Sequence, residues 1–152
     1  MNICEIELRL GHSLPNSYKN LLDSIEDYAY ISFNEYPLDF PNDEGASWFM
    51  WGVERLGKAV EMDCAGKELA YAQLKLHTAL DRRLRNRDYV KSPQGEIALD
   101  RVASGFVIAE DNGDLLYLDF QDEGSVWRYM HDSGDVRRLD LNFNEWMSRA
   151  TL

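Results

Sequence analysis

The chain has 152 residues, of which 45% are hydrophobic and 12% aromatic; this suffices for one domain with a buried core and excludes a disordered protein. Its 27 acidic and 16 basic residues give a net charge of −11, which disfavours binding to nucleic acids or anionic lipids and attracts basic partners. A charge of this size also promotes solubility, and composition alone leaves both explanations open.

Two cysteines, Cys4 and Cys64, are too few for a disulfide framework and are expected to be reduced, buried thiols. Glu5 and Glu7 interrupt the N-terminal stretch where a signal peptide would need an apolar run. The sequence also lacks an apolar stretch long enough to span a membrane. These features predict a cytoplasmic protein.

Two amphipathic segments open the chain. Residues 3–10 fit both a strand and a helix, and Gly11, which is suited to end a helix, favours the helix. Residues 15–27 predict a clear helix, which Pro15 is suited to begin because its missing N–H is not needed there. The apolar stripe of this helix consists of Leu14, Tyr18, Leu21, Leu22 and Ile25.

The middle of the sequence carries strand and loop signals before a long helix. Aromatic and β-branched residues predict strands at 30–35 and 47–52, with a loop rich in turn-forming residues at 37–45. A helix is predicted over 67–87, with arginines in its last turns, where the helix dipole favours cations. Residues 92–95 then break the chain. The predicted apolar stripe of the long helix consists of Leu69, Leu76, Leu80 and Leu84.

An antiparallel meander is predicted over 105–131. Asn112-Gly113 is the strongest hairpin signal, because a type I′ turn requires positive φ at both positions. Asn142 is predicted to cap a C-terminal helix by accepting a hydrogen bond from the backbone N–H of Glu145, with Leu141 and Trp146 as a hydrophobic staple. The predicted fold is therefore α+β, with residues 1–152 as a single domain. The expected strands of the meander are 106–110, 115–120 and 125–130.

The sequence carries no motif for catalysis, cofactor binding or metal binding. It has no G-x-S-x-G elbow, no P-loop and no G-x-G-x-x-G. His12, His77 and His131 are far apart, and His77 is expected at the surface. His131-Asp132 is similar to the HD pair of metal phosphohydrolases, but it ends a predicted strand, whereas that chemistry needs further ligands on helices. We therefore expect no catalytic residue, no cofactor, no metal site and no small-molecule substrate.

Two charged segments each have two explanations. In a two-residue hairpin, Asp111 and Asp114 would face each other, so the turn is either simply solvated, which is favoured, or holds a cation or basic side chain between them. The segment 82–91 holds five basic residues, which suggests nucleic acid. Only Tyr89 is interleaved as an aromatic, so a helix end that complements its dipole is favoured.

Two segments together resemble the SUKH superfamily, which includes bacterial immunity proteins and fungal cell-wall-synthesis regulators. The first is Leu10-Gly11 followed by LPNSYKNLL at 14–22. The second runs from FVIA at 106–109 through DLLYLD, VWRY and HD to NFNEWM at 142–147. The chain departs from the family pattern in having Asn112-Gly113 for a double glycine, Asn142 for a serine, and a poorly matching middle over about 53–100.

The resemblance implies a mostly antiparallel sheet flanked by helices, without catalytic residues or cofactor. It also implies an immunity protein that binds and neutralises a cognate toxin, often a nuclease or other nucleic-acid-targeting enzyme. Such toxins tend to be basic because they bind phosphates, and an acidic inhibitor complements them. A regulatory or scaffolding module is the alternative, although the chain lacks the long disordered flanks of the fungal relatives; an enzyme is the third possibility.

The partner surface is expected on two acidic loops, because loops carry function on a rigid scaffold. Trp48 is expected to be exposed beside the first loop and to act as an aromatic anchor, while the acidic residues steer a basic partner. The expected partner-binding residues are Asp43 and Glu44 on the first loop with Trp48 beside them, and Glu110, Asp111 and Asp114 on the second.

Overall fold

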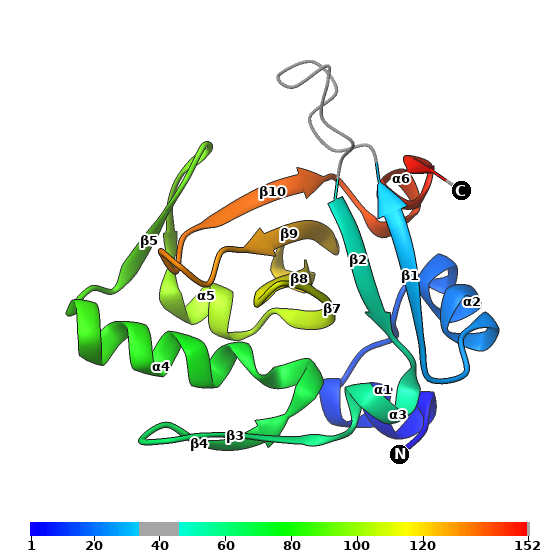
Figure 1. The fold of residues 1–152 in the computed structure, drawn as a ribbon, viewed down its shortest axis with the longest axis horizontal. Coiled ribbons are helices and arrows are strands. Elements are labelled where there is room, and N and C mark those ends of the chain that lie inside the picture. The colour runs from blue at the N-terminus through cyan, green and yellow to red at the C-terminus, as the bar shows by residue number, and fades with distance from the viewer. Residues whose placement is uncertain (34–45, 152) are drawn as a thin grey trace.

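The computed structural model describes residues 1–33 and 46–151, which form one domain with a curled, seven-stranded antiparallel sheet and surrounding helices (Figure 1). The strand order is β10-β9-β8-β7-β2-β1-β11, so the predicted α+β class is confirmed. The strands of this sheet are β1 Tyr28–Phe33, β2 Ala46–Trp51, β7 Phe106–Asp111, β8 Asp114–Asp119, β9 Ser125–Tyr129, β10 Val136–Asp140 and β11 Ala150–Thr151.

The predicted meander is confirmed as β7, β8 and β9, which pair antiparallel in sequence order. Asn112 and Gly113 form the first turn with φ of 50° and 94°, as the hairpin signal requires. The neighbouring strand β10 was not predicted, because charged residues at 137, 138 and 140 obscure its alternation.

The hairpin of β1 and β2 joins the N-terminal part of the chain to the meander. Tyr30 lies opposite Phe49 across this hairpin, and Phe49 lies opposite Glu110 on β7. Both predicted strands are confirmed within the described residues, and β1 begins two residues earlier than expected. Residues 34–35 of the first predicted strand and the predicted loop at 37–45, with Asp43 and Glu44, lie outside the described residues.

The helices at both ends follow their sequence signals. The ambiguous first segment is helix α1 (Ile3–Leu10), which ends at Gly11 with φ of 79°. Helix α2 (Asn16–Ser24) begins after Pro15 but ends three residues before the predicted limit. Asn142 caps α6 (Phe143–Met147) by accepting a 2.8 Å hydrogen bond from the backbone N–H of Glu145, as predicted.

Aromatic side chains form the centre of the core between the sheet and the terminal helices. Trp146 stacks on Phe33 with ring centroids 3.6 Å apart, and Phe143 contacts Tyr18 edge-on at 5.1 Å. The staple expected from Leu141 does not cover Trp146, because Leu141 is 60% exposed. The motif residues interpreted as core are all buried: Leu14, Tyr18, Leu22, Leu116, Leu118, Trp127, Phe143 and Trp146.

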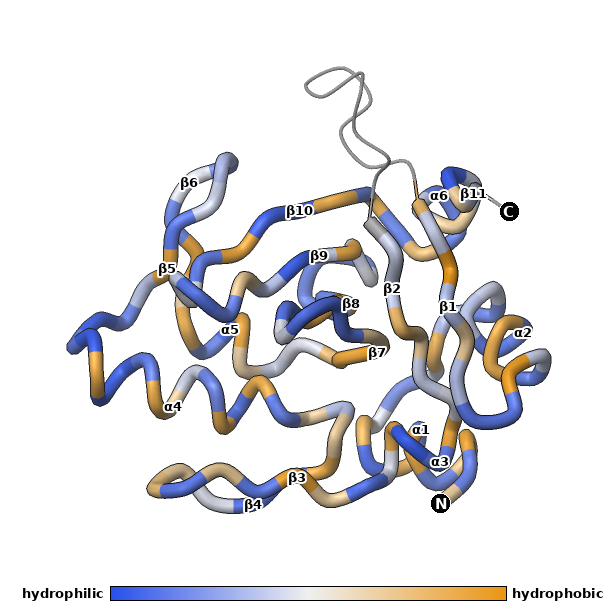
Figure 2. The backbone as a smooth tube through the Cα atoms, viewed as in Figure 1, coloured by the Kyte–Doolittle hydropathy of each residue, from blue (hydrophilic) through white to orange (hydrophobic). Residues whose placement is uncertain are grey.

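The predicted long helix over 67–87 is wrong in its first third. Residues 67–69 belong to a hairpin of β3 (Ala59–Met62) and β4 (Gly66–Leu69), with positive φ at Cys64 in the turn and at Gly66, the first residue of β4. A 3-10 turn at Ala70–Ala72 leads into α4 (Leu74–Arg85). In Figure 2, α4 alternates between hydrophobic and hydrophilic residues along its length.

The predicted leucine stripe of this helix is also wrong at its end, where Leu84 is 80% exposed. The buried positions of α4 are instead Leu74, Leu76, Thr78 and Asp81. Thr78 Oγ1 donates a 2.7 Å hydrogen bond to the carbonyl of Leu74, and Asp81 is ion-paired, so two polar residues occupy buried positions that an apolar pattern misses.

The rest of the middle region consists of short elements. They are α3 (Val53–Leu56), the hairpin of β5 (Tyr89–Ser92) and β6 (Gly95–Ala98), and α5 (Leu99–Ala103). Within the described residues, no helix is long and apolar enough to cross a membrane.

Two expectations for single residues are overturned. Cys4 and Cys64 are exposed, because Cys4 lies on the outer side of α1 and Cys64 lies in the β3–β4 turn. His77 is half-buried against the ring of Tyr129, with centroids 5.5 Å apart, and its burial lowers its pKa.

Candidate protein-binding surface

The β7–β8 turn is the acidic element that the sequence singled out, and its charges are partly balanced within the chain. Asp111 and Asp114 lie opposite each other, as expected. Arg128 of β9 reaches both, with Nη2 3.3 Å from Asp111 Oδ2 and 2.8 Å from Asp114 Oδ2. The basic group between the two carboxylates therefore comes from the chain itself.

His131 holds the other side of Asp114. Its Nδ1 lies 2.6 Å from Asp114 Oδ1, and its backbone N–H donates to the same oxygen at 3.0 Å. Burial opposes ionisation of Asp114, but the hydrogen bonds from His131 and Arg128 outweigh it, so the pKa of Asp114 is lowered. The same contact with Asp114 raises the pKa of His131.

Glu110 differs from the two aspartates, because it is exposed and has no ion-pair partner among the residues that the structure describes. It precedes the turn on β7, opposite Phe49 of β2. Of the three acidic residues predicted on this loop, Glu110 is thus the one whose charge is fully available to a partner.

Trp48 is not exposed, so the expectation of an exposed aromatic residue at this position is wrong. Its side chain is fully buried, and the guanidinium of Arg128 lies 4.7 Å from its ring centroid. Successive residues of a strand point to opposite faces, so Trp48 points into the core while Phe49 points outward.

The exposed aromatic residues lie one position away, on the outer face of β1 and β2. We call Tyr28, Tyr30 and Phe49 the aromatic cluster. Phe49 stacks on Tyr28 at 4.6 Å and contacts Tyr30 edge-on at 5.0 Å. Tyr28 is 48% exposed and Tyr30 is 71% exposed, so large ring surfaces face solvent in a packed arrangement.

Arg55 of α3 fixes one side of the aromatic cluster. Its guanidinium lies 5.3 Å from the ring centroid of Tyr28 and 5.0 Å from that of Phe49. It also donates two hydrogen bonds to the carboxylate of Asp27, at 2.9 and 3.1 Å. Gly52, which precedes α3, lies against the backbone of Asp27, because a Cβ there would be 2.8 Å from the carbonyl oxygen of Asp27.

A hollow of about 420 Å³ connects the aromatic cluster to the acidic turn. Such a surface combines rigid rings, which lose little entropy on binding, with carboxylates at the rim. The tyrosines were not predicted as contact residues, because aromatic anchors were expected beside loops. The strand pattern could have indicated them: Tyr28 and Tyr30 fall on one face of the strand, and Ile31 falls on the other. The hollow is lined by Tyr30, Ser47, Phe49, Arg55 and residues 110–113.

The basic segment at 82–91 is largely used within the fold. Asp81, whose side chain is buried, accepts hydrogen bonds from Arg85 and Arg87. Burial opposes ionisation of Asp81, but these bonds prevail and lower its pKa. Arg82 pairs with Asp88 and Asp100. Arg82, Arg85 and Arg87 thus have ion-pair partners within the fold, in addition to the helix dipole that was expected to favour them.

The described residues contain no group of three or more His, Cys, Asp or Glu side chains that could hold a metal ion. His131 lies against two carboxylates, Asp114 and Asp132, with Nε2 3.1 Å from Asp132 Oδ1. The HD pair at 131–132 is thus part of an ion-pair group around the turn.

The fold is a curled antiparallel sheet flanked by helices, and its outer face presents exposed aromatic and acidic residues. The model of the SMI1 / KNR4 family (SUKH-1) matches residues 2–149, and the chain belongs to this family. Membership supports an immunity-like or regulatory role through protein partners. No curated protein and no solved structure gives a significant match.

Proposed function

We propose that this protein is an immunity protein that binds a cognate bacterial toxin in the cytoplasm and blocks it without catalysis. The single observation that carries the proposal is the aromatic cluster beside Glu110. Exposed tyrosines that are already packed together, next to a carboxylate without an ion-pair partner, are typical of an interface core with an acidic rim. A net charge of −11 favours a basic partner, such as a toxin that acts on nucleic acids.

The proposed contact residues follow from this surface. Tyr30 and Phe49 replace Trp48 as aromatic anchors, and Glu110 supplies an available charge. Asp111 and Asp114 add charge that Arg128 partly balances. Asp43 and Glu44 remain proposed contacts from the sequence alone.

The experiment is co-expression with the product of the neighbouring gene, tested as the candidate toxin. The protein should rescue growth and co-purify with the toxin. Tyr30→Ala and Glu110→Gln should weaken rescue, whereas Tyr89→Ala, which removes a comparably exposed tyrosine from β5, should not. Rescue that is unaffected by either surface variant would place the interface elsewhere.

A regulatory or scaffolding module is the second candidate, because the family includes such proteins. It predicts stable complexes with host proteins and no protection against a toxin. Co-purification without growth rescue would favour it over the immunity role.

A further inference from the structure

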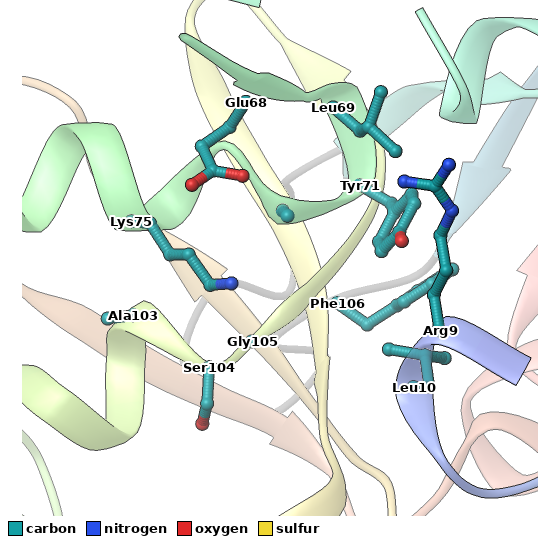
Figure 3. A pocket seen from close by; sticks show the side chains of 11 residues that line it. Arg9, Leu10, Glu68, Leu69, Tyr71, Lys75, Ala103, Ser104, Gly105 and Phe106 are labelled. Carbon is teal, nitrogen blue, oxygen red and sulfur yellow. The ribbon is translucent and has the colours of Figure 1, made fainter. Parts of the chain in front are cut away.

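A pocket of about 470 Å³ lies between the end of α1, the start of α4 and the segment that enters β7 (Figure 3). Arg9 borders it on one side, and Lys75 and Glu68 border it on the other, with Tyr71 and Phe106 between them (Figure 3). None of these residues belongs to the aromatic cluster or to the acidic turn, so the pocket is separate from the proposed partner surface.

The three charged groups of the pocket are unpaired. Over residues 1–33 and 46–151, Arg9, Glu68 and Lys75 form no ion pair and no side-chain hydrogen bond. Several arginines elsewhere in this acidic chain are paired: Arg82 and Arg87 each bridge two carboxylates. Two unpaired cations beside one carboxylate make this pocket locally positive in a protein of net charge −11.

The position of Lys75 is unfavourable for the helix that carries it. Lys75 is the second residue of α4, and a cation in the first turn is opposed by the positive end of the helix dipole. Arg9 lies in the last turn of α1, where the dipole favours it. Lys75 therefore costs local stability and gains no partner within the described chain, which suggests that it serves a ligand.

The pocket has a rigid aromatic wall. The rings of Tyr71 and Phe106 stack with centroids 5.0 Å apart and an interplanar angle of 27°. Burial raises the pKa of Tyr71, while the charge of Arg9 lowers it and that of Glu68 raises it. The charges of Arg9 and Glu68 are thus both close enough to act on the phenol of Tyr71, beside which a ligand would lie.

We propose that this pocket binds a small organic oxyanion, meaning a carboxylate or phosphate ester attached to a flat apolar body. Arg9 and Lys75 would hold the oxyanion, and Tyr71 and Phe106 would contact the apolar part. Glu68 repels a second negative charge and accepts a hydrogen bond from an N–H or O–H of the ligand. The volume lies within the range of small-molecule sites.

The test is an NMR titration of the full chain with benzoate, phenyl phosphate and inorganic phosphate at constant ionic strength. Benzoate or phenyl phosphate should cause saturable shifts of backbone amides around Leu10, Lys75 and Gly105. The comparison of benzoate with phenyl phosphate distinguishes a carboxylate site from a phosphate-ester site.

Matched variants separate this pocket from general charge effects. Arg9→Gln and Lys75→Gln should each weaken binding by about tenfold, as expected for one lost charged hydrogen bond. Glu68→Gln should strengthen it. Lys67→Gln is the control. Lys67 lies on β4 beside Glu68 but does not line the pocket, so this variant should leave the affinity unchanged.

The amide spectra also show whether each variant is folded, so loss of binding cannot be confused with unfolding. Absence of saturable shifts with both organic probes would overturn the proposal. Equal weakening by Lys67→Gln and Lys75→Gln would also overturn it, as would equal affinity for inorganic phosphate and phenyl phosphate.

Discussion

Aromatic side chains serve both the core and the surface of this protein, depending on the strand face or helix face that they occupy. Trp48 and Phe49 are neighbours on β2, yet one is fully buried and the other packs with exposed tyrosines. On α6, Trp146 is buried against Phe33. Single residues therefore divide into those that stabilise the fold and those available to a partner.

Replacement of Trp146 by alanine should lower the free energy of unfolding by about 3–5 kcal/mol, because it leaves a large cavity beside Phe33. Urea denaturation measures the change. Leu141→Ala, which trims an exposed side chain one turn away, should be nearly neutral. A near-neutral effect of Trp146→Ala would show that the indole is not buried.

His131 and His77 should titrate in opposite directions from the ordinary value of 6.5. The pKa of His131 is raised, chiefly by its hydrogen bond to Asp114, and the pKa of His77 is lowered, chiefly by burial. His131 therefore adds stability below pH 6.5, and this is lost as the pH rises through its raised pKa. NMR titration of the imidazole signals measures both pKa values.

The contribution of His77 to the stability of the fold has the opposite pH dependence. Its contribution is present above pH 6.5 and is lost as the pH falls towards its lowered pKa. His131→Asn should remove the stability gain at low pH and leave the pKa of His77 lowered by burial alone, because the charge of His131 also contributes to that lowering. Coincident titration of both residues near 6.5 would contradict the two environments.

At the scale of single elements, the end of α4 is held by ion pairs. Arg87 connects Asp81 of α4 to Asp135 and to the carbonyl of Ser133 in the β9–β10 turn. Gly134 passes close to this group, since a Cβ there would lie 2.7 Å from Asp81 Oδ1. The helix end and the turn are thus positioned by one buried carboxylate.

Asp81→Asn should therefore lower the free energy of unfolding by about 1–3 kcal/mol, because Arg85 and Arg87 lose a charged acceptor. Chemical denaturation checks the size. Asp88→Asn is the matched control, since Asp88 is an exposed partner of Arg82 and surface pairs contribute little. Equal effects of the two variants would rule out a special role for the buried carboxylate.

For the whole molecule, acidity is expected to govern how fast a partner binds. Many aspartates are paired with arginines, whereas Glu110 has no pair among the described residues and borders the aromatic cluster. Long-range attraction acts before contact, so it changes the association rate more than the dissociation rate.

Raising the salt concentration should slow association with a basic toxin much more than it speeds dissociation. Glu110→Gln should lower the association rate and flatten its salt dependence. Glu96→Gln removes the same charge from β6 and should have a smaller effect. Surface plasmon resonance measures both rates; an association rate that ignores salt would contradict a steered, basic partner.

Local patterns in the sequence were sufficient to predict the α+β class, the meander, the capped C-terminal helix and the family. A positive-φ turn at Asn112-Gly113 and a cap at Asn142 act over a few residues, so they are readable without the fold. The ordered motifs at both ends then indicated the family that matches residues 2–149.

The tertiary structure alone decided which side chains meet. The buried stripe of α4 includes Thr78 and Asp81, whose polar groups are hydrogen-bonded or ion-paired, whereas Leu84 is exposed. Arg128 between two aspartates, Phe49 among tyrosines, and the pocket of Arg9 and Lys75 all join segments distant in sequence. Such contacts depend on which faces become covered, and no local pattern specifies that.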